Sequence, residues 1–184
     1  MSLNIPSRIS HDLGLAAWFG GTLANAVALN RAAAETSNYS SAGRVTNAGW
    51  NAWTPVNAVA IGAHLLGSVG QLRGNKDRLF SQKGVGTMSV TKTVLTAAAL
   101  GVTAYSRVLG QRIADRPSVP VESGTEPTTT TPPEIAAAQK QLKALQWAIP
   151  AITGALVVVS AYAGEQQRPG AVKAGVLDRL NPLS

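Results

Sequence analysis

The chain has 184 residues, of which 45% are hydrophobic and 14% charged, and it contains no cysteine. The lack of cysteine excludes a disulfide framework, a thiolate metal site and a thiol nucleophile. The net charge of +7 would suit nucleic acid, but the low aromatic content of 5% and the lack of a compact basic domain argue against it. We expect no nucleic acid partner, and instead a membrane and its surface.

Four apolar runs follow one another along the chain. Each is about as long as a helix needs to cross a hydrocarbon core, roughly 17–25 residues, with the second at the short end. They cover residues 13–29, 55–70, 90–109 and 144–164. The first run also fits a signal peptide ending at Ala34, but we treat it as retained. The fold expected is all-α: a four-transmembrane-helix bundle forming a single integral membrane domain over residues 1–184.

The loop between the second and third runs is strongly basic. Short loops rich in Lys and Arg remain in the cytoplasm, so this loop is expected there. An even number of crossings then places both termini in the cytoplasm, where Arg8, Arg168, Lys173 and Arg179 agree with the assignment. The predicted location is the cytoplasmic (inner) membrane, with several passes. The same loop is expected to contact anionic lipid headgroups through Arg73, Lys76, Arg78 and Lys83.

The connection between the third and fourth runs is long and rich in proline and threonine. Residues 117–133 are therefore expected to form a disordered or extended loop on the external, periplasmic side. The "TPPE" that ends it has the pattern of a capping box, with Thr131 as the cap and Glu134 as its partner. After the fourth run, "AVKAGVLDRLNPL" is expected to form a short interfacial helix.

Small residues spaced four apart occur in the first three runs. Lipid offers no hydrophobic driving force between helices, so such spacing favours close helix packing. The glycines singled out are Gly21, Gly62, Gly67 and Gly101. Packing within the bundle is the favoured reading, and an oligomer interface is the alternative.

Polar side chains inside the runs are few and are candidates for function. They are Asn25, Asn57, His64 and Lys92. His64 and Lys92, with His11 and Asp12, are expected to approach one another, and a histidine there could relay protons. Hydrogen bonds between helices are the more probable use of these groups, including one between Asn25 and Asn57. A haem between His11 and His64 is disfavoured because their expected depths differ by about 10 Å. We expect no metal and no cofactor.

The usage of Ala, Val, Gly, Thr and Arg, with the Pro/Thr tract, resembles that of small four-span membrane proteins of high-GC actinobacteria. The resemblance is one of amino-acid composition over the whole chain, depends on no diagnostic motif and implies no functional residues. All nine acidic residues fall outside the runs, so an enzyme is not expected. The first hypothesis is a non-catalytic accessory or scaffold subunit that contacts other membrane subunits or itself. A small oligomeric transporter or channel is the second hypothesis, and a lipid-binding protein is the third.

Overall fold

The computed structural model describes residues 4–36, 38–116 and 118–180, and these are helical apart from short connections. Within this part of the chain no strand forms, and the only bridge pairs Val121 with Pro127. The expectation of an all-α fold is confirmed. The segments are α1 (Asn4–Ala24), the π-helix η1 (Asn25–Leu29), α2 (Asn30–Ala34), α3 (Tyr39–Gly74), α4 (Lys76–Ser81), α5 (Val85–Ala114), α6 (Pro133–Glu165) and α7 (Pro169–Leu180).

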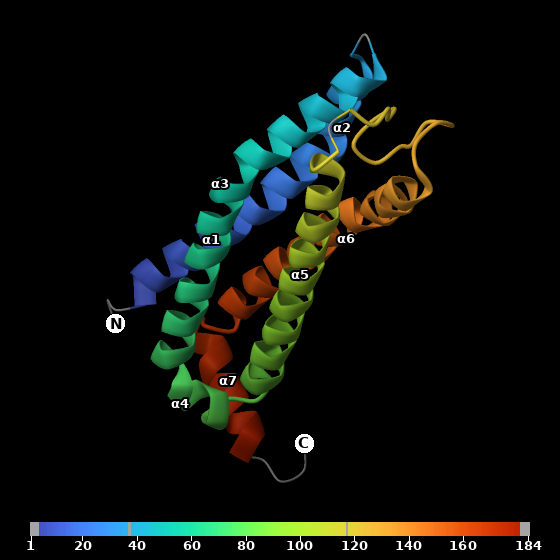
Figure 1. The fold of residues 1–184 in the computed structure, drawn as a ribbon. Helices are drawn as coiled ribbons and strands as arrows, with labels where there is room; N and C mark the ends of the chain where they lie inside the picture. Colours follow the sequence, from blue (N-terminus) through green and yellow to red (C-terminus); the bar gives the residue numbers. More distant parts are fainter. Residues whose placement is uncertain (1–3, 37, 117, 181–184) are drawn as a thin grey trace.

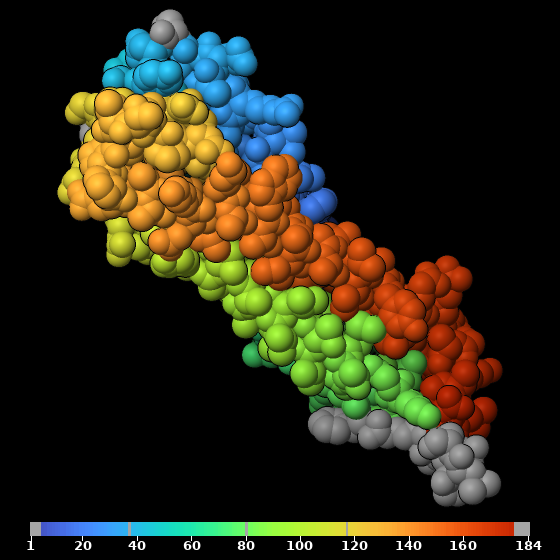
Figure 2. All heavy atoms as spheres, turned by 90° about the vertical axis from the view of Figure 1, so that its right-hand side faces the viewer, coloured from blue at the N-terminus to red at the C-terminus, as the bar shows by residue number. Residues whose placement is uncertain are grey.

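Two long antiparallel pairs make up an elongated molecule (Figures 1 and 2). In one pair α1 runs along α3, and in the other α5 runs along α6. The two pairs are joined mainly through α1 and α6, whereas α3 and α5 barely touch. The helices therefore follow the order α3, α1, α6, α5, and the side between α3 and α5 is the least closed.

Two helices, α5 and α6, are long and apolar enough to cross a membrane. Little of their apolar stretches is buried inside the molecule, unlike the core helix of a soluble protein. The expected runs 13–29 and 55–70 lie within longer and more polar helices. The helical segment from α1 to α2 includes Arg8 and Asp12, and the first half of α3 is rich in Ser, Thr and Asn. The prediction of four spans is therefore supported for two of them, α5 and α6.

The pairing of α1 with α3 depends on glycines that let the two backbones approach. A Cβ atom at Gly14 would collide with the backbone at Ala60 and His64, and one at Gly67 would collide with the backbone at Ser7 and His11. No side chain can be accommodated at either position without moving a helix. These contacts fix both the separation of α1 and α3 and their register.

The core lies where α1 crosses the second pair. Trp18 and Leu156 are fully buried there, and Leu15, Ala99 and Ile149 complete the cluster. A second, smaller cluster joins the end of α5 to the start of α6 through Leu109, Ile113, Ile135 and Ala138.

The segment expected to be disordered or extended is held against the helices wherever the structure describes it. Within residues 118–132, Val121 is buried and its amide donates to the Tyr39 carbonyl. Gln139 of α6 donates to the Ser123 carbonyl at 2.9 Å. The capping box does not form, because the Thr131 hydroxyl donates to the Pro120 carbonyl at 2.6 Å and Glu134 pairs with Arg116. Pro132 provides the N-cap of α6 without any side-chain hydrogen bond.

Two substitutions on one helix test the α1–α3 contact. Gly14→Ala places a methyl group against the α3 backbone, so it should lower the free energy of unfolding by about 1–3 kcal/mol. Gly20→Ala meets nothing within 4 Å, so it should instead raise that energy by about 0.5–1 kcal/mol through helix propensity. Thermal unfolding in detergent, followed by circular dichroism, measures both. Equal effects of the two changes would contradict the close approach.

Candidate functional site

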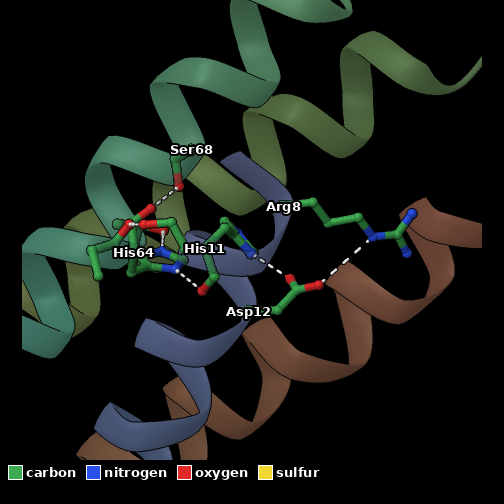
Figure 3. A network of polar contacts seen from close by, with 8 residues as sticks. Arg8, His11, Asp12, His64 and Ser68 are labelled. Carbon is green, nitrogen blue, oxygen red and sulfur yellow. Dashed lines mark hydrogen bonds and ion pairs between the residues drawn. The ribbon is translucent and has the colours of Figure 1, made fainter. Parts of the chain in front are cut away.

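The structure brings His11, Asp12 and His64 together where α1 meets α3 (Figure 3). Both imidazoles are fully buried, and their ring centroids are 4.4 Å apart. His11 Nδ1 lies 2.7 Å from Asp12 Oδ1 and must donate, because a carboxylate only accepts. Asp12 lies between His11 and Arg8 (Figure 3). The Nε of Arg8 is 3.7 Å from Asp12 Oδ2, the carboxylate oxygen that does not bond His11.

Contacts of His64 extend the cluster to α5. Its Nδ1 lies 3.4 Å from the His11 carbonyl, and its Nε2 lies 3.4 Å from the Thr96 hydroxyl. Since a carbonyl only accepts, Nδ1 carries the proton and Nε2 accepts from Thr96. Lys92, one turn before Thr96, is close enough to interact electrostatically with Asp12 and with both histidines. The cluster thus connects three helices by polar contacts.

One expectation about the histidines is corrected by this geometry. The predicted spans place His11 at the membrane boundary and His64 about 10 Å deeper, from the rise of a helix per residue. The helix in fact begins at Asn4, and its antiparallel pairing with α3 puts His11 level with His64. The two rings are in contact, so this arrangement leaves no room for a macrocycle between them.

Asn25 and Asn57 are not brought to the histidine cluster, nor do they bond each other. Asn25 begins the π-helix and donates to the Gly21 carbonyl of its own helix at 2.9 Å. Asn57 lies on α3, and its buried Oδ1 has no hydrogen-bond partner among the described residues. The expected bond between these two side chains is absent, because Asn25 bonds its own helix while Asn57 lies beside the cavity.

The four glycines predicted for packing divide into two kinds. Gly21 lies directly against the Trp53 indole, and Gly67 against the α1 backbone, so both serve the α1–α3 contact. A Cβ at Gly62 or Gly101 would meet nothing within 4 Å. These two glycines are not required for packing within the described chain. Gly14 and Gly70 were not predicted from the sequence. Gly14 approaches α3, and Gly70 approaches Ser7 of α1, as closely as Gly67 approaches the α1 backbone.

Among the cations of the basic loop, Arg78 differs from the others. Its guanidinium donates to the Gln166 carbonyl at 2.8 Å and to Gln82 Oε1, and its partial burial lowers its pKa below the usual value. Gln82 is buried and also donates to the Gln166 carbonyl. These bonds attach the α3–α5 connection to the end of α6. Arg73, Lys76 and Lys83 are exposed.

A cavity of about 300 Å³ lies toward the other end of the molecule, lined by α3, α5, the first half of α6, Thr22 of α1, Asn30 of α2 and residues 124 and 125. Its walls are mainly apolar, formed by residues such as Ile61, Leu100 and Ile149. The side chains of Trp50, Trp53 and Asn57 line it from α3. Its volume is at the lower end of the range for small-molecule sites, about 300–1,000 Å³.

Four buried polar atoms on residues lining this cavity have no hydrogen-bond partner in the described chain. Buried polar groups are normally satisfied, so each of these atoms calls for a partner. They are Asn30 Oδ1, Trp53 Nε1, Asn57 Oδ1 and Ser106 Oγ. Asn30 is 7% exposed, and its side-chain amide nitrogen donates to Gln146 Oε1 at 2.5 Å, so only its Oδ1 lacks a partner. We interpret the cavity as the candidate functional site.

The residues of the cavity are far apart in sequence, which is why sequence analysis identified only Asn57. The sequence signal nearest to the cavity is the pair Trp50 and Trp53 before the second run. Tryptophans at the end of a span typically anchor a helix at the membrane interface, so the pair alone does not indicate a cavity.

The polar cluster can be tested through Asp12. Asp12→Ala removes the acceptor of the buried His11 N–H, so it should lower the free energy of unfolding by about 1–3 kcal/mol. Glu35→Ala is the control, because Glu35 is exposed and its side chain makes no bond to any residue that the structure describes. Chemical unfolding in detergent micelles compares the two. A loss no larger than that of the control would show that the Asp12–His11 bond contributes nothing to stability.

Comparisons with known proteins give no relative from which a role could be transferred. No family model, no curated protein and no solved structure matches this chain. Its function is therefore argued from the geometry of the cavity and its surroundings.

Proposed function

We propose that this protein is a four-span, non-catalytic protein of the cytoplasmic membrane that binds an amphiphile in the cavity between α3, α5 and α6. The observation that carries the proposal is the cavity itself, with mainly apolar walls and four unpartnered buried polar atoms. An amphiphile meets both requirements, since its apolar part covers the walls and its polar part bonds the unpartnered atoms.

The exposed side chains support a membrane setting for all four long helices. Large apolar side chains face outward on α1, α3, α5 and α6. Examples are Leu13, Val59, Leu66, Val90 and Val158, each more than 60% exposed. In water, surfaces of this kind would favour aggregation, whereas lipid solvates them. The basic loop that contains α4 is proposed to lie in the cytoplasm. With that orientation α7 is also on the cytoplasmic side, and the cavity lies near the external interface.

The transporter hypothesis receives less support. Such a protein would need polar groups along a continuous path. His64 and Lys92 lie toward one end of the bundle, and Asn57 lies in the cavity toward the other. The core of Leu15, Trp18 and Leu156 fills the space between the two groups.

An accessory or scaffold role is the second candidate, and Gly62 and Gly101 favour it. Both expose a small-residue surface that the described chain does not use for its own packing. Such a surface lets another membrane helix approach closely. This role is compatible with ligand binding, because Gly62 and Gly101 do not line the cavity.

The topology can be tested directly because the chain has no cysteine. Single cysteines at Thr129, in the external loop, and at Lys76, in the basic loop, should differ in their reaction with a membrane-impermeant maleimide. On intact cells Thr129→Cys should be labelled and Lys76→Cys should not, until the membrane is permeabilised. The reverse pattern, or labelling of both on intact cells, would contradict the proposed orientation.

Ligand binding can be tested by filling the cavity. Gly110 lines it and meets nothing within 4 Å, so Gly110→Phe should occupy the space without disturbing neighbours. Gly101→Phe is a matched control on the same helix, equally open but outside the cavity. Native mass spectrometry should find a lipid retained by the wild type and by Gly101→Phe, and lost from Gly110→Phe.

The same control separates the two candidate roles. If Gly101→Phe retains the lipid but no longer co-purifies with a larger membrane assembly, the accessory role is supported as well. A wild-type protein that retains no lipid would contradict the proposed binding function.

A further inference from the structure

We infer that the polar part of the ligand is uncharged and rich in hydroxyl groups, as a sugar is, and that it enters from the side, between α3 and α5. This inference rests on the proposed binding function and specifies the class of ligand. It follows from the kinds of unpartnered atoms, the charges around them and the position of the mouth.

Hydrogen-bond complementarity gives the first argument. Asn30 Oδ1 and Asn57 Oδ1 can only accept, so a ligand group that reaches them must donate. Trp53 Nε1 can only donate, so a ligand group that reaches it must accept. The Ser106 hydroxyl can do either. A group that donates and accepts at several nearby points is required, and hydroxyl groups do both. An ionised phosphodiester or carboxylate group has no proton to donate at neutral pH, so it cannot itself bond the two asparagine oxygens.

Charge gives the second argument. The lining contains no acidic residue, and its single cation is Arg107. Both terminal nitrogens of the Arg107 guanidinium already donate to Asn51 Oδ1 at 3.1 Å. The other polar lining residues are neutral. Asn51 is neutral, so the bonds to it do not compensate the charge of Arg107, but they hold the guanidinium at the exposed edge of the cavity. Among the neutral lining residues farther in, an ionised head group would have no counter-charge, which is costly. An uncharged group avoids that cost.

Aromatic groups give the third argument. Trp50 and Trp53 both line the cavity, from adjacent turns of α3. An indole offers a flat apolar face with one donor at its edge, and this combination suits a sugar ring, whose C–H groups cover the face while its hydroxyls bond the edge. The volume of about 300 Å³ suits a ring-sized group rather than an entire lipid.

The position of the mouth indicates how the ligand enters. The exposed members of the lining include Asn51 and Ala58 on α3 and Ala104 on α5. These two helices barely touch, so the cavity opens on the side between them. The bonds from Arg107 to Asn51 cross this opening. In the proposed orientation the opening lies near the external interface, where lipid head groups lie.

The test compares three lipids that differ only in the polar group, together with the sugar alone. The protein, prepared in a detergent without a sugar head, is titrated with galactosyl diacylglycerol, phosphatidylmethanol, diacylglycerol and water-soluble methyl galactoside. Binding is followed by native mass spectrometry and by the shift of the unfolding midpoint. Galactosyl diacylglycerol should bind at least tenfold more tightly than phosphatidylmethanol or diacylglycerol. Methyl galactoside binding as tightly as the glycolipid would support the hydroxylated class and identify a free sugar as the source, whereas weak binding would identify the lipid.

A pair of serine variants tests the contact itself. Ser106→Ala removes one hydroxyl from the cavity and should weaken glycolipid binding roughly threefold to tenfold. Ser160→Ala removes a hydroxyl that is equally buried and unpartnered but lies outside the cavity, so it should leave affinity unchanged. Equal affinities of the two variants would overturn the inference.

The remaining outcomes separate this inference from the proposed function. If phosphatidylmethanol binds best and Ser106→Ala weakens it, the cavity binds lipid but the uncharged class is wrong. If neither lipid nor sugar binds while the protein remains folded, ordered water satisfies the polar atoms, and both the inference and the proposed function fail.

Discussion

The close approach of α1 and α3 at Gly14 and Gly67 is the constraint on which the rest of the structure depends. Because neither position can hold a side chain, the two helices are fixed at one distance and in one register. That register makes His11 and His64 neighbours and sets Trp53 against Gly21. Since α1 uses one face for α3 and another for α6, it separates α3 from α5. The cavity exists because those two helices are held apart.

Polar groups are placed differently at the two ends of the bundle. Near α4 several of them bond one another or the backbone, as His64 does with the His11 carbonyl and Arg78 with the Gln166 carbonyl, although His11 Nε2 and Gln71 Nε2 have no partner among the described residues. Near α2 four unpartnered atoms belong to residues that line the cavity. A buried polar group that is paired within the protein stabilises it, whereas an unpaired one is costly until a ligand or a water bonds it. The two ends therefore differ in the cavity that lies beside the unpaired groups near α2.

The sequence was sufficient to predict that the chain is helical, but not which helix faces meet. Apolar length located α5 and α6, and small-residue spacing found Gly21 and Gly67. The same spacing also selected Gly62 and Gly101, which pack against nothing in the described chain, because spacing does not reveal whether a partner helix lies opposite. The cavity could not be predicted, since Asn30, Trp53, Ser106 and Gln146 come from four different helices. Its position depends on the separation of α3 and α5, which no local pattern encodes.

The bonds between the α3–α5 connection and the end of α6 have a mechanical consequence. Arg78 and Gln82 hold this end of the pair against the Gln166 carbonyl, and α4 joins the two helices there through a short connection. At the opposite end, the hydrogen bonds that link α3 to α5 are those from Arg107 to Asn51, among the residues that the structure describes. The two helices are therefore joined by a short connection and several hydrogen bonds at the α4 end, whereas at the cavity end the polar link that the structure describes between them comes from one arginine. The opening between α3 and α5 can widen only if the two hydrogen bonds of Arg107 break.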